Sequence, residues 1–90
     1  MKKIEKIYYI QKEEFQLGTK TVYSPFFYTN YKLAKSEFEK LIEIEKSNLE
    51  YLEEETKALD CVMLKGIDEW GETEIEIYLR HGEVDELIKK

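Results

Sequence analysis

The stretch TEIEIYLR (residues 73–80) alternates between two kinds of side chain. Ile75, Ile77 and Leu79 fall on one side of an extended chain, and the intervening positions carry Glu74, Glu76, Tyr78 and Arg80. A period of two is typical of an antiparallel strand with one buried and one solvated face. The sequence therefore predicts a sheet that buries one of its faces.

The neighbouring segments supply further strands. An apolar run at residues 58–66 (ALDCVMLKG) has strand length and ends at Gly66, and residues 67–72 (IDEWGE) predict a loop before the alternating strand. Near the N-terminus, residues 3–11 and 19–24 are rich in β-branched and aromatic side chains and predict a hairpin. Pro25 cannot donate to a strand ladder, so we expect it to end the second strand or lie in an edge bulge.

A helix is expected between the hairpin and the apolar run. From Tyr31 to about Glu55 there is no Gly or Pro, and apolar residues recur at helical spacing: Ala34, Phe38, Leu41, Ile42, Leu49 and Leu52. Thr29 or Asn30 is the expected N-cap. Ser47 and Glu50 have the spacing of a second helix start, so one continuous helix, which we prefer, competes with two helices broken near Ser47. Residues 83–90 predict a short terminal helix.

These segments define the expected fold. The order β-β-α-β-β-α is an α+β fold, in which one long helix covers one face of a small, mostly antiparallel sheet. The 90 residues make a single domain, residues 1–90.

The aromatic residues raise the question of a contact surface. VYSPFFYTNYK (residues 22–32) precedes the helix, and we expect Phe26 and Phe27 in the core, with Tyr28 and Tyr31 as candidates for partner contact. Trp70 lies among acids, where it is either an exposed binding anchor or a lid folded over the end of the sheet.

Composition narrows the class of protein. There is one Cys, no signal-peptide core and no apolar run that could span a membrane, so we expect a cytoplasmic protein without membrane association. The net charge is −6: residues 1–36 carry +4, residues 37–86 carry −12, and Lys89 and Lys90 add +2. An acidic chain is a poor partner for nucleic acid itself.

The inventory of reactive residues is small: His81, Cys61 and Arg80 are the only residues of their types. No spacing suits a metal, and the glycines are isolated and form no phosphate loop. We therefore expect no catalytic residue, no metal, no cofactor and no enzymatic activity.

The acidic residues allow two interpretations. Carboxylates on a rigid scaffold can imitate a phosphate backbone and occupy the nucleic-acid channel of another protein. Runs of glutamate are also commonly just a solvated surface. On the first interpretation, the candidate partner-binding residues are Asp68, Glu69, Trp70, Glu72, Glu74, Glu76, Tyr28 and Tyr31.

The segment KIYYI, a second strand and then YTNYKLAKSEFEKLIE resemble small proteins of phages and mobile elements in low-GC bacteria, over roughly residues 3–46. This group includes anti-CRISPR and other anti-defence inhibitors. The resemblance implies an inhibitor. Because an acidic segment attracts basic surfaces, we expect its partner to be a host protein with a basic surface, and we expect the chain to be a monomer or a homodimer. An oligomeric binder of a nucleotide signal is an alternative, with Lys20, Tyr28, Lys32 and Arg80 as contributors. A structural or accessory subunit is a third.

Overall fold

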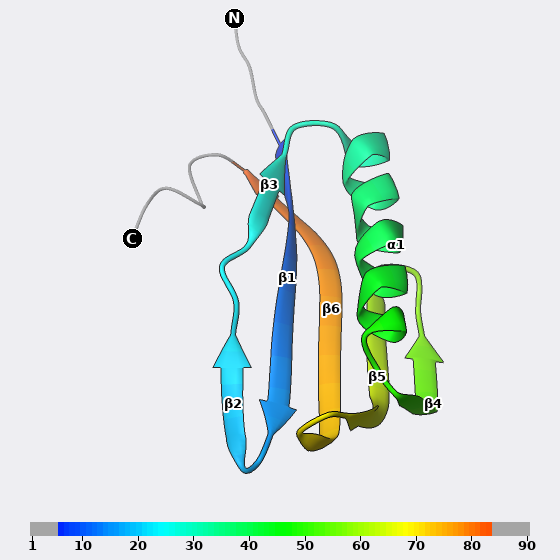
Figure 1. Ribbon diagram of the computed structural model, residues 1–90. Coiled ribbons are helices and arrows are strands. Elements are labelled where there is room, and N and C mark those ends of the chain that lie inside the picture. The colour runs from blue at the N-terminus through cyan, green and yellow to red at the C-terminus, as the bar shows by residue number, and fades with distance from the viewer. Residues whose placement is uncertain (1–5, 84–90) are drawn as a thin grey trace, which may run out of the picture.

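The computed structural model describes residues 6–83, which form one antiparallel sheet and one helix (Figure 1). The elements in chain order are β1 (Lys6–Gln16), β2 (Thr19–Val22), β3 (Phe26–Tyr28), α1 (Tyr31–Ser47), β4 (Tyr51–Lys57), β5 (Cys61–Asp68) and β6 (Gly71–Glu83). The expected α+β class and the small antiparallel sheet are confirmed.

The sheet is built around β6, which contains the alternating stretch. The spatial order is β2-β1-β6-β5-β4, and β3 pairs with the N-terminal half of β1 beside β2. The two neighbours of β6, β1 and β5, both run antiparallel to it. Every residue of β1 has a partner on β6, from Lys6 opposite Glu83 to Gln16 opposite Thr73. The stretch with the clearest alternation is therefore the centre of the sheet.

The core lies between the sheet and α1. Ala34, Phe38 and Ile42 of the helix are fully buried, because residues four apart lie on one face of a helix. They pack on a layer of sheet residues: Ile10, Val62, Leu64, Ile75, Ile77 and Leu79. Burial of each large apolar side chain contributes about 1.5–3 kcal/mol, so this layer holds α1 on one face of the sheet.

The predicted order of elements was wrong in three places. Residues 26–28 form an extra strand, the helix ends at Ser47, and residues 51–57 form β4, so residues 6–83 have the order β-β-β-α-β-β-β. The predicted terminal helix mostly falls on residues 84–90, which lie outside the described residues, whereas Glu83 belongs to β6. The statement that the helix covers one face was also too broad, because α1 contacts mainly β6, β1 and β3.

The ends of α1 have local causes. Asn30 is the N-cap, and its side chain accepts a hydrogen bond from the Leu33 amide at 2.9 Å, which settles the choice between Thr29 and Asn30. At the other end the Ser47 hydroxyl donates to the Ile44 carbonyl at 2.8 Å. The Glu50 amide then donates to the Ile67 carbonyl of β5 at 2.8 Å, so pairing with the sheet begins three residues after the helix ends.

The prediction that Phe26 and Phe27 are core residues was also wrong. Their side chains are 62% and 56% exposed. They form the short edge strand β3, and Pro25 lies in the break between β2 and β3. No described helix in residues 6–83 is long and apolar enough to cross a membrane.

Candidate partner-binding face

One face of the sheet packs against α1, and no helix within residues 6–83 covers the other, which we call the open face. Ile75, Ile77 and Leu79 are buried toward α1, so the side chains between them point to the open face. The alternation expected from the sequence is therefore confirmed. The acidic side chains of β6 lie on the side of the sheet that a partner can reach.

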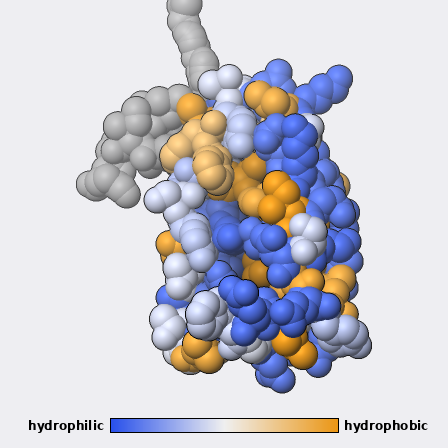
Figure 2. All heavy atoms as spheres, in the orientation of Figure 1, coloured by the Kyte–Doolittle hydropathy of each residue, from blue (hydrophilic) through white to orange (hydrophobic). Residues whose placement is uncertain are grey.

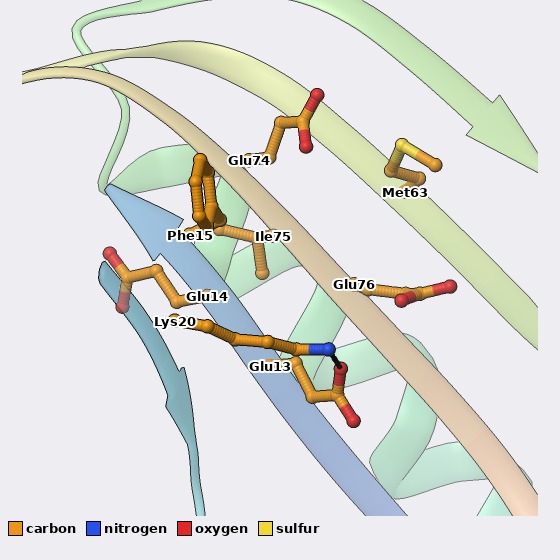
Figure 3. Close-up of a pocket in the computed structure, with 8 residues that line it drawn as sticks. All are labelled: Glu13, Glu14, Phe15, Lys20, Met63, Glu74, Ile75 and Glu76. Atoms are coloured by element: carbon orange, nitrogen blue, oxygen red, sulfur yellow. Dashed lines mark ion pairs between the residues drawn. The ribbon is translucent and has the colours of Figure 1, made fainter. Parts of the chain in front are cut away.

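Three carboxylates gather on the open face: Glu13 on β1, and Glu74 and Glu76 on β6 (Figure 3). Glu13 stands directly opposite Glu76 in the strand register. Glu72 precedes Glu74 on the same side of β6, and residues two apart on a strand are separated by about 7 Å. The backbone of a central strand thus fixes the spacing of these negative charges.

Two neighbours keep Glu13 charged. The Tyr78 hydroxyl donates to Glu13 Oε2 at 2.5 Å, and Lys20 Nζ lies 3.0 Å from Glu13 Oε1. These two hydrogen bonds lower the pKa of Glu13, and the one from Tyr78 has the larger effect. The hydrogen bond to Glu13, together with burial, raises the pKa of Tyr78 to about 12. Like charges opposite each other repel, and these two partners offset the repulsion between Glu13 and Glu76.

The carboxylates of β6 are only partly compensated. Lys65 Nζ on β5 lies 3.6 Å from Glu74 Oε2, a partly exposed pair that contributes little to stability. Within residues 6–83, neither Glu72 nor Glu76 forms an ion pair. On this face, which also carries Lys20 and Arg80, a partner with a basic surface would meet Glu72 and Glu76 as carboxylates outside any ion pair.

The β5–β6 turn, formed by Glu69 and Trp70, lies at one end of the open face, and Asp68 is the last residue of β5 before it. Asp68 Oδ1 accepts from the Trp70 amide at 2.7 Å and from the Gln16 side-chain amide at 2.8 Å. Gln16 thereby ties this turn to the end of β1. The Trp70 side chain is 67% exposed, so it is not a lid over the core; its role as a binding anchor stays a prediction.

Tyr28 and Tyr31 lie elsewhere. Tyr28 is paired with Tyr8 at the opposite end of β1 and packs partly against the core. The Tyr31 ring makes an edge contact with Tyr8 at 5.5 Å between centroids, and its hydroxyl lies 3.4 Å from Asp60. The structure thus brings Asp68, Glu69, Trp70, Glu72, Glu74 and Glu76 to one region but does not bring the two tyrosines there.

Sequence reasoning missed Glu13, Phe15 and Leu17. Glu13 and Phe15 face Glu76 and Glu74 only through the pairing of β1 with β6, which the sequence does not specify. Leu17 is the first residue of the two-residue turn between β1 and β2, and it is 77% exposed. An apolar residue in a tight turn, where Asn is preferred, was the signal that could have identified it.

Cys61 and His81, two of the three reactive residues named above, have different surroundings. Cys61 is partly buried on the open face; desolvation, with the nearby Glu76 carboxylate, raises the pKa of its thiol. A raised pKa keeps the thiol protonated and weakly nucleophilic. His81 lies against the Tyr8 ring. Among residues 6–83, no three His, Cys, Asp or Glu side chains are placed to hold a metal ion.

An apolar groove lies on the other side of the molecule, between β3 and α1 (Figure 2). It has a volume of about 440 Å³, and its walls include Tyr23, Phe26 and Leu41. The four residues named for a nucleotide binder do not meet there. Lys20 and Arg80 both lie on the open face, but Lys20 is level with a position of β6 six residues from Arg80. Tyr28 faces the helix side, and Lys32 is exposed on α1.

Comparison with protein families, curated proteins and solved structures finds no match for this chain.

Proposed function

We propose that this chain is a non-enzymatic binding protein whose open face occupies a basic, nucleic-acid-binding surface of another protein. The observation that carries the proposal is the row Glu72, Glu74 and Glu76 on a central strand, on a sheet face that no described helix covers. Fixed carboxylates attract a basic surface, speed association and exclude nucleic acid from it by like-charge repulsion. From the resemblance given above, a host defence protein is the expected partner.

The accessory-subunit alternative has less support, because both sheet edges are poor templates for another strand. On β4 the register shifts between Leu52 and Glu54, and the strand carries mostly charged side chains. On the opposite edge, Pro25 separates β2 from β3. Bulges, charges and proline are the features by which proteins protect sheet edges from further pairing.

The test is capture of partners from a lysate of the source organism by the immobilised protein. We expect the captured protein to be released by rising salt and by a DNA oligonucleotide, since both compete with exposed charge pairs. A triple variant, Glu72→Gln, Glu74→Gln and Glu76→Gln, should lose most of the capture.

The control is a variant with the same net charge, Glu37→Gln, Glu39→Gln and Glu43→Gln, whose substitutions all lie on α1. It should capture the partner as well as the unchanged protein does. If the two triple variants bind equally well, the open face is not the site and the proposal is wrong.

A further inference from the structure

A hollow of about 500 Å³ opens where the β1–β2 and β5–β6 turns meet at the end of the open face. Leu17, Trp70 and Phe15 supply its apolar walls. Glu53 and Glu72, which form no ion pair within residues 6–83, also line it, together with the Lys65–Glu74 ion pair. Trp70 also lines a second hollow with Glu50 and Glu69. An exposed tryptophan bordered by carboxylates suits a cationic side chain.

The walls of the hollow are held in place. Gln16 donates to Asp68 Oδ1 at 2.8 Å and contacts the Gly71 carbonyl at 3.4 Å, so one amide links the two turns. Asp68 also accepts from the Trp70 amide at 2.7 Å. A rigid recognition surface loses less conformational entropy when a partner binds.

Leu17 carries features that folding does not require. Its φ is 55°, in the left-handed region that leucine rarely adopts, and its side chain is 77% exposed. A residue that is strained and exposes apolar surface at once points to a role in binding. The same turn position would be occupied without strain by asparagine or glycine.

We propose that this hollow binds an arginine side chain of the partner protein. The guanidinium plane stacks on the Trp70 ring, its methylene groups lie along Leu17 and Phe15, and Glu72 or Glu53 accepts its N–H groups. The inference rests on the proposed function and adds to it the side chain that is recognised.

The first experiment uses Trp70, the only tryptophan, as the reporter in titrations with an oligoarginine peptide. We expect saturable quenching or a shift of the Trp70 emission, and about two- to fivefold weaker binding of an oligolysine peptide of equal length. Equal affinities for the two peptides would overturn the arginine site, because net charge alone would then account for binding.

The second measurement separates this hollow from the carboxylate row. Leu17→Asn leaves every carboxylate in place, removes one apolar wall of the hollow and relieves the backbone strain in the β1–β2 turn. It should weaken oligoarginine binding about two- to fivefold while raising the melting temperature, so loss of folding cannot explain the result. Glu43→Gln on α1 serves as a surface control and should change neither quantity.

The two proposals fail differently. If Leu17→Asn binds oligoarginine and captures the partner as well as the unchanged protein does, the arginine site is wrong. The proposed function still holds in that case, provided that the triple variant of β6 loses capture. If the triple variant also captures normally, both are wrong.

Discussion

Among residues 6–83, Leu17 is the one non-glycine residue with a positive φ. Its φ of 55° and that of Gly18 at 76° are those of a type I′ hairpin turn. A side chain other than that of Gly, Asn or Asp costs about 1–2 kcal/mol in this region. We therefore predict that Leu17→Asn raises the free energy of unfolding by about 1 kcal/mol.

Chemical denaturation of the unchanged protein and of Leu17→Asn measures this difference. Leu33→Asn on α1 is the control, since Leu33 is also a leucine more than half exposed, at 51%. The control should not gain stability, because its φ is helical. A loss of stability in Leu17→Asn would contradict the account of the turn.

Tyr78 gives a second prediction for a single residue. The hydrogen bond to Glu13, together with burial, raises the pKa of Tyr78 to about 12, from an ordinary value of 10.0. Since the pKa is raised in the folded state, the stability from this contact is fully present below pH 10.0 and is lost as the pH rises through about 12. Glu13→Gln should bring the pKa of Tyr78 back toward its ordinary value.

Tyrosinate absorbance follows this titration, with Tyr78→Phe identifying the signal. Glu74→Gln removes a carboxylate from the same face without touching the Tyr78 hydroxyl, and should leave the high-pH component unchanged. An unchanged titration in Glu13→Gln would refute the assignment.

At the scale of elements, α1 is fastened to β1 by a partly buried ion pair. Lys12 Nζ lies 2.8 Å from Glu45 Oε2, and the two side chains are 20% and 11% exposed. Removing one side chain of the ion pair leaves the charge of the other unpaired in a partly desolvated environment. We predict that Glu45→Gln lowers the free energy of unfolding by about 1–3 kcal/mol.

The control is Glu43→Gln, two residues away, whose carboxylate is 71% exposed and 3.7 Å from Lys46. Its effect on thermal or chemical unfolding should be close to zero. If the two variants unfold alike, the pair between α1 and β1 does not contribute to stability.

The elements that the sequence predicted are those with a local pattern. The alternation in residues 73–80 identified β6 and placed Glu74 and Glu76 on the open face, because a strand with one buried face must alternate. β4 has no such pattern: it is a mostly exposed edge strand rich in glutamate, a helix former, and only its pairing with β5 makes it extended. Helical spacing at Leu49 and Leu52 was therefore misleading.

The candidate site was predicted in part for the same reason. The carboxylates of β6 and the β5–β6 turn are close in sequence, so their grouping could be recognised. Glu13 and Leu17 join them only through the register of β1 against β6, which depends on contacts between distant residues. Phe26 and Phe27 were assigned to the core because they precede the helix cap and are large, but they lie in the short edge strand β3, where both are exposed.

At the scale of the whole molecule, the acidic field around Trp70 predicts how charged quenchers reach it. The indole is 67% exposed and lies beside Glu69 and Glu72, in a chain of net charge −6. Local potential concentrates cations and excludes anions near such a residue. We predict that caesium ions quench Trp70 emission more efficiently, and iodide less efficiently, than each quenches free tryptophan amide.

The difference between the two ions should shrink as sodium chloride is added, because the Debye length falls from about 10 Å at 0.1 M to about 3 Å at 1 M. Neutral acrylamide should quench strongly at every salt concentration, as expected for an exposed ring. Glu69→Gln combined with Glu72→Gln should reduce the preference for caesium, whereas the α1 triple variant should preserve most of it. If at low salt neither ion quenches Trp70 differently from the way it quenches free tryptophan amide, the field around Trp70 is too weak to attract a cationic partner. That result would count against the open face as an acidic docking surface.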